Sequence, residues 1–165
     1  GVVFLLLAFT LWIHFQGART YKNYAYSKLT LTQEKMDTAT LLRKYGGFHP
    51  LGQEVALDIL TKSRRAEVIA LVREQKSLDP PSLWTALAVF EQLKQVDITP
   101  YLVFHLKDAV NTSNSAVLTK GVVFLLNANN EESKKALNEI ENYAKQDKKF
   151  EYALRIILEE ERRRL

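Results

Sequence analysis

The stretch from Thr99 to Leu126 reads TPYLVFHLKDAVNTSNSAVLTKGVVFLL, and its pattern decides the fold class. Apolar residues recur every three or four positions on both sides of a short polar segment, NTSNS (111–115). This spacing is typical of helices that bury one face. Asparagine, serine and threonine favour helix ends and turns. The stretch therefore predicts two helices joined by a tight turn.

The same helical spacing extends in both directions, and no run of strict alternation predicts a strand. Turn and cap signals separate the segments at Gly46-Gly47, Pro50, SLDPP (77–81), Asp97 to Pro100, and NANN (127–130). We expect helices over residues 32–45, 51–62, 65–76, 81–96, 99–110, 115–127, 131–146 and 149–164. The chain is thus predicted to be all-α, with a helical-repeat domain over residues 32–165.

A shift of 34 residues aligns apolar positions in two families of helices. In the first family it places Ile69 on Val103 and Leu137, and Val72 on Leu106 and Ile140. In the second it places Val55 on Val89, Val123 and Ile157, and Ala56 on Phe90, Phe124 and Leu158. A helix bundle needs no constant period, whereas stacked two-helix units produce one. The period therefore predicts a stack of about four two-helix repeats.

The units TPYLVFHLKDAV and AVLTKGVVFLL, with NTSNS between them, resemble HEAT-type repeats, and the resemblance covers about residues 32–164. Tetratricopeptide repeats share the 34-residue period. The last unit (134–157) is similar to one, with Ala136, Tyr143, Phe150 and Ala153 near the small and aromatic positions. It has one extra residue at Lys148-Lys149, and the middle units lack the tetratricopeptide pattern, which favours the HEAT-like interpretation. Either resemblance implies a small right-handed α-solenoid that binds proteins.

Residues 2–15 read VVFLLLAFTLWIHF and are apolar apart from Thr10 and His14. We predict a transmembrane or membrane-anchoring helix over residues 1–18. Fourteen helical residues cover roughly 21 Å, less than the roughly 30 Å hydrocarbon core, so we expect a spanning helix to begin before residue 1. The alternatives are a cleaved signal peptide and a helix buried in a core or on a partner.

A basic, tyrosine-rich linker is predicted to follow over residues 19–31. The stretch from Arg19 to Lys44 carries six basic and two acidic residues, which accounts for the whole net charge of +4. A basic stretch directly after an apolar segment suits anionic lipid headgroups, whereas nucleic-acid binders spread basic residues over a folded face. We therefore predict no nucleic-acid partner, and a single-pass membrane protein with a cytoplasmic C-terminal domain. The predicted membrane-interface residues are Trp12, Arg19, Tyr21, Lys22, Tyr24, Tyr26 and Lys28.

No motif in the chain indicates catalysis, a metal site or a cofactor. The absence of Cys excludes disulfides and thiolate chemistry. His105 has Asp108 three residues further on, and we predict that this histidine lies at the surface or in a groove. Glu54 and Asp58 are predicted to form a solvated face. The sequence thus predicts neither an enzyme nor a cofactor.

The predicted function is a non-catalytic scaffold or assembly subunit that binds another protein in a membrane-associated complex. The concave face of a solenoid is its usual binding surface. The predicted partner-binding residues are Tyr101, Thr85, Gln92, Lys120 and Arg155. One alternative is a lipid-binding module that uses the basic stretch. Another is an accessory subunit of a membrane electron-transfer complex, with His14 as a cofactor ligand.

Overall fold

The computed structural model describes residues 2–74, 76, 78–93, 98–112, 114–146 and 148–164, apart from the side chains of residues 2, 3, 148–150, 153, 162 and 164. Within these ranges every regular element is helical and no strand occurs, which confirms the all-α prediction. The α-helices are α1 (Val2–Gln33), α2 (Thr38–Lys44), α3 (Pro50–Asp58), α4 (Arg65–Arg73), α5 (Pro80–Gln92), α6 (Thr99–Asn111), α7 (Ser115–Ala128), α8 (Glu131–Ala144) and α9 (Lys148–Arg164). A 3₁₀ turn, η1 (Tyr45–Gly47), follows α2, and a π-helical turn, η2 (Ile59–Ser63), follows α3.

The two polar loops of the C-terminal half end and begin helices as predicted. The Asn114 side chain accepts a hydrogen bond from the Val117 amide at 3.0 Å and so caps α7. Asn129 has a left-handed backbone (φ 45°) and ends α7. Asn130 and Ser133 form a reciprocal capping box that starts α8. The predictions from NTSNS and NANN are therefore confirmed.

The N-terminal helices differ from the predicted boundaries. Helix α1 continues without a break through residues 19–31, which we predicted to be a linker, and the next helix begins at Thr38 instead of residue 32. No proline interrupts the chain before Gln33, and Tyr26 and Leu29 pack against the core. Tertiary packing therefore keeps the basic stretch helical. The cap signals at Ser77 and Asp97 lie outside the described residues, as do the side chains of Phe150 and Ala153.

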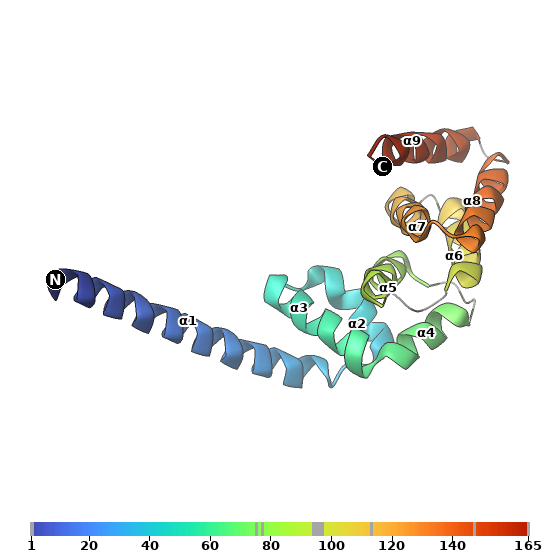
Figure 1. The fold of residues 1–165 in the computed structure, drawn as a ribbon. Coiled ribbons are helices and arrows are strands. Elements are labelled where there is room, and N and C mark those ends of the chain that lie inside the picture. The colour runs from blue at the N-terminus through green and yellow to red at the C-terminus, as the bar shows by residue number, and fades with distance from the viewer. Residues whose placement is uncertain are drawn as a thin grey trace.

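The helices after α3 pack in two rows. Helix α6 packs against α4 and α8, and α7 packs against α5 and α9. Across the rows, α7 also packs against α6 and α8. Figure 1 shows α1 and α9 at opposite ends of this stack, with the N-terminal half of α1 extending away from all other helices.

The 34-residue spacing predicts only part of the core in each row, since the aligned residues Ile69, Val103 and Leu137 are half-buried. In the row of α4, α6 and α8, the equivalent residues Val72, Leu106 and Ile140 are all fully buried. In the other row Val89 of α5 is fully buried, as is Val55 of α3, which precedes the two rows. Their equivalent in α7, Val123, is only half-buried, and its neighbour Val122 takes the core position. Helix α7 is thus rotated by one residue relative to the spacing that the sequence predicts.

Candidate functional site

The N-terminal half of α1 extends away from the other helices (Figure 1), and its apolar side chains are exposed. Its large apolar side chains, each more than half exposed, are Phe4, Leu5, Leu6, Leu7, Phe9, Leu11, Trp12, Ile13 and Phe15. Successive residues turn by about 100° around a helix, so this set points in every direction from the axis. None of the described helices combines the length and the apolar character that a membrane crossing requires.

The predicted membrane-interface residues lie along α1, and all but one are exposed. Trp12, Arg19, Tyr21, Lys22, Tyr24 and Lys28 are exposed. Lys22 also forms an ion pair with Glu54 of α3, with 3.5 Å between the ammonium nitrogen and the carboxylate oxygen. Tyr26 is half-buried against the core. Part of its ring therefore contacts the protein itself.

Tyr26 connects α1 to α3. Its hydroxyl donates a 2.7 Å hydrogen bond to the carboxylate of Asp58, which raises the pKa of Tyr26 to about 12. The ammonium of Lys62 lies 2.6 Å from the same carboxylate, and the hydrogen bonds from Lys62 and Tyr26 lower the pKa of Asp58. Glu54 and Asp58, which we predicted to be a solvated pair, thus both bind side chains of α1.

Three of the predicted partner-binding residues lie on consecutive helices of one row. Gln92 of α5 and Arg155 of α9 are exposed. Lys120 of α7 is mostly buried, because its ammonium lies 3.1 Å from both carboxylate oxygens of Glu91 and 4.6 Å from the ring centroid of Trp84. Lys120 therefore ties α7 to α5, and its charge is already compensated.

The other two predicted partner-binding residues are placed differently. Thr85, which we predicted to bind a partner, is only 1% exposed and therefore not accessible, and its hydroxyl donates to the Pro81 carbonyl oxygen. Tyr101 is half-buried on α6, in the opposite row, with the Arg73 guanidinium 5.6 Å from its ring centroid. The helical period alone does not tell which polar residue of a turn faces the core, and this explains the error at Thr85.

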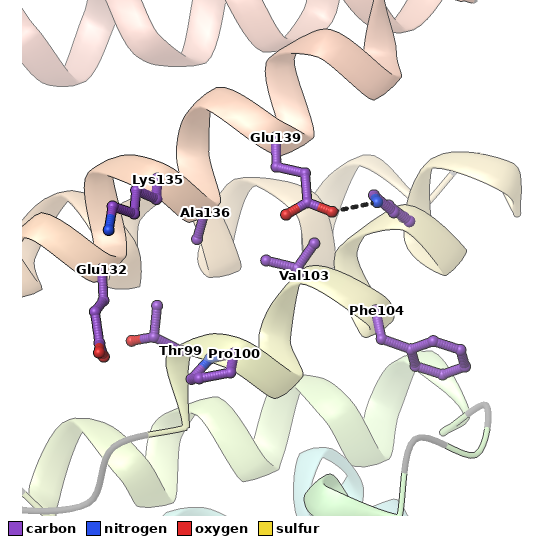
Figure 2. Close-up of a pocket in the computed structure, with 9 residues that line it drawn as sticks. Thr99, Pro100, Val103, Phe104, Glu132, Lys135, Ala136 and Glu139 are labelled. Atoms are coloured by element: carbon purple, nitrogen blue, oxygen red, sulfur yellow. Dashed lines mark hydrogen bonds and ion pairs between the residues drawn. The ribbon is translucent and has the colours of Figure 1, made fainter.

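A groove that the sequence did not reveal lies between α6 and α8 (Figure 2). Its volume is about 510 Å³, and Pro100, Val103 and Ala136 form apolar parts of its wall. The Lys107 ammonium lies 2.6 Å from the carboxylate of Glu139, so a salt bridge links the two helices beside it. This lysine and glutamate are 32 residues apart, which is close to the 34-residue spacing of the sequence. That separation was the signal from which the ion pair could have been predicted.

His105 is not at the surface, contrary to one part of our prediction. It is 1% exposed, and its Nε2 lies 2.9 Å from the carbonyl oxygen of Val72. Burial lowers the pKa of His105, opposed by the hydrogen bond to Val72 and the charge of Asp108. Together with Asp79 and Asp108, it lines a cavity of about 90 Å³. No group of three or more His, Asp or Glu side chains in the described part of the chain is arranged to hold a metal ion.

The described chain thus presents the exposed apolar half of α1 and, on α5 and α9, the exposed polar residues Gln92 and Arg155. No family model matches this chain, and no curated protein or solved structure matches it. Its function is therefore inferred from the geometry and chemistry of its own residues.

Proposed function

We propose that this chain is a non-catalytic scaffold that α1 holds at a membrane while the helical stack binds another protein. The observation that carries this proposal is the set of exposed apolar side chains between Phe4 and Phe15, which surround the helix axis. A helix that packs on a neighbouring protein needs only one apolar stripe, whereas a helix that is apolar all round is enclosed on all sides. Lipid acyl chains provide such an enclosure.

The length of the apolar half supports insertion as the mode of anchoring. The helix from Phe4 to Phe15 covers roughly 18 Å, compared with a hydrocarbon core of roughly 30 Å. This part of α1 can therefore place its apolar side chains well below the headgroups. With Arg19, Lys22 and Lys28 directly behind it, the stack belongs on the cytoplasmic side of the membrane.

The scaffold half of the proposal rests on the two rows of helices. Each helix of a row packs on the next but one along the chain, as in a HEAT-like right-handed solenoid of two-helix repeats. The row of α5, α7 and α9 carries the exposed residues Gln92 and Arg155. These two residues are the proposed protein-binding positions of the stack.

Insertion is tested with Trp12, because the chain contains only one other tryptophan, Trp84. In the full chain carrying Trp84→Phe, phosphatidylcholine vesicles are expected to shift the Trp12 emission to the blue, and brominated acyl chains are expected to quench it. The matched control is Trp12→Phe, in which Trp84 reports on the stack and is expected to respond to neither. A Trp12 emission that ignores the vesicles would remove the membrane from the proposed function.

Protein binding is tested by crosslinking the full chain in native membranes. Arg155→Glu, together with Gln92→Glu, is expected to lose the stoichiometric partner that the unchanged chain captures. The matched control is Lys135→Glu on α8, which reverses a charge in the opposite row. If the double variant captures the same partner as fully as the control, the row of α5, α7 and α9 is not the binding face.

A further inference from the structure

The C-terminal half of α1 differs in chemistry from the apolar half that precedes it. It carries three basic residues and no acidic residue, and α1 as a whole has no acidic residue. Three tyrosines, Tyr21, Tyr24 and Tyr26, are interspersed among these cations. A positively charged helix segment with tyrosine rings, continuous with an exposed apolar helix, has the composition of a segment at the boundary between lipid and water.

One side of this segment is already occupied by α3. Tyr26 donates its hydrogen bond to Asp58, and Lys22 is paired with Glu54. Further along the same side, the Gln33 side chain donates a 3.0 Å hydrogen bond to the carbonyl oxygen of Gly52. Tyr26, Lys22 and Gln33 therefore each bond to α3 on this side.

The opposite side of the segment has no covering element in the described chain. Tyr24, Lys28 and Leu31 follow one another at intervals of four and three residues, which places them in one strip along the helix. Tyr24 and Leu31 are 60% and 63% exposed, and Lys28 is exposed as well. The Lys28 ammonium lies 5.3 Å from the ring centroid of Tyr24, so the cation and the ring face the same surroundings.

We propose that the strip formed by Tyr24, Lys28 and Leu31 lies against the headgroups of an anionic bilayer. The inference rests on the proposed function, because α1 must first be inserted by its apolar half. It adds an orientation: α1 enters at a shallow angle, so that the strip meets the membrane surface while α3 and the stack lie on the far side of the helix.

The charges and the residue types favour an anionic lipid surface over a protein partner. Tyrosine prefers the headgroup level, and the Lys28 ammonium would neutralise an anionic headgroup there. Leu31 adds an apolar contact at the end of the strip. The helix offers no carboxylate to repel phosphate groups, and the compensated cation Lys22 points to the protein side.

The experiment compares Lys28→Gln with Lys22→Gln in the full chain. Both variants remove one positive charge from an exposed lysine of the same helix, but Lys22 is on the side of α3. Binding is measured by co-sedimentation with vesicles of phosphatidylcholine alone and with vesicles of phosphatidylcholine and phosphatidylserine. Thermal unfolding of both variants is measured in parallel to show that the stack is intact.

The expected result is tighter binding of the unchanged chain to the vesicles that contain phosphatidylserine. Lys28→Gln is expected to weaken this binding on the order of fivefold, the effect of one basic residue near the surface, and Lys22→Gln clearly less. If both variants lose the same amount of binding to these vesicles, binding depends only on the net charge of the chain and not on the strip, and the inference is overturned. Equal binding to both vesicle types would also overturn it while leaving anchoring by α1 intact. No binding to either vesicle would instead overturn the proposed function itself.

Discussion

The Nε2 atom of His105 on α6 lies 2.9 Å from the carbonyl oxygen of Val72 on α4, and the histidine is 1% exposed. The carbonyl oxygen can only accept, so the ring is in the tautomer that carries its proton on Nε2 and donates it to Val72. This hydrogen bond joins neighbouring helices of one row across 33 positions of sequence. No local sequence pattern predicts this contact between α4 and α6.

Replacing His105 by alanine is expected to destabilise the fold by roughly 2 to 4 kcal/mol. The change removes the hydrogen bond to Val72 and leaves a void in a packed region next to an existing cavity. Chemical unfolding followed by circular dichroism measures the effect. The control is His49→Ala at the start of α3, where the side chain is partly exposed and makes a longer, 3.3 Å hydrogen bond. Equal losses at the two histidines would contradict the structural role of His105.

The stability of the protein is expected to fall as the pH drops below the ordinary histidine value of 6.5. Burial lowers the pKa of His105 in the folded state, so the unfolded chain takes up the proton first and is favoured by acid. The stability begins to fall near the pKa that His105 has in the unfolded chain, and it continues to fall until the pH reaches the lower pKa of His105 in the folded state. Unfolding curves of the unchanged chain and of His105→Gln, which cannot titrate, are expected to converge as the pH is lowered through this window. A constant difference between them would contradict the prediction.

Removing the hydroxyl of Tyr26 is expected to cost about 1 kcal/mol, because its hydrogen bond to Asp58 is only partly shielded from water. Tyr26→Phe keeps the ring and deletes only the hydrogen bond to Asp58 of α3. The matched control is Tyr24→Phe on the exposed side of the same helix, which is expected to change nothing measurable. Thermal unfolding distinguishes the two variants.

The hydrogen bond between Tyr26 and Asp58 also predicts how stability changes at alkaline pH. The folded-state pKa of Tyr26 is raised to about 12 from the model-compound value of 10.0, so the stabilisation is complete below pH 10 and is lost between these two values. A spectrophotometric titration of the folded chain is expected to show one tyrosine ionising later than the exposed ones. This late step is expected to be absent in Tyr26→Phe. Its persistence there would assign the late step to another tyrosine.

Gly121 of α7 lies directly against Leu106 of α6. A Cβ at this position would overlap a methyl carbon of Leu106, whose side chain is fully buried. Gly121→Val is therefore expected to destabilise the fold by about 1 to 3 kcal/mol through overpacking. Gly17→Val in α1 is the control, because a Cβ there would meet nothing within 4 Å. If both variants unfold like the unchanged chain, the two helices are further apart than the structure shows.

Much of the local structure could be predicted from the sequence because it depends on neighbouring residues. Helix ends at Asn114 and Asn130 are set by side chains that bond backbone amides three residues further on. The register of Val72, Leu106 and Ile140 could be predicted because equivalent helices of one row bury equivalent residues. The core residue of α7 was predicted less well. Val122 is buried in place of Val123, because the rotation of α7 depends on how closely Gly121 lets this helix approach Leu106.

The sites were harder to predict than the helices. Thr85 and His105 are polar residues within amphipathic helices, and each bonds a backbone carbonyl oxygen inside the protein. A polar residue that finds a backbone carbonyl can be buried at little cost, so polarity alone does not indicate exposure. The groove between α6 and α8 and the ion pair of Lys107 with Glu139 arise only when the two helices are stacked.

The helical class, the capped loops and the apolar character of residues 2–15 follow from local sequence, because periodicity, capping and hydropathy are properties of short stretches of chain. Contacts between helices were needed to show that α1 continues to Gln33, that Tyr26 and Lys22 face α3, and that Tyr24, Lys28 and Leu31 face outward. The physical reason is that a helix has no preferred face until another element packs against it. Once α3 covers one side of α1, the opposite side is defined as the surface that a partner or a membrane can reach.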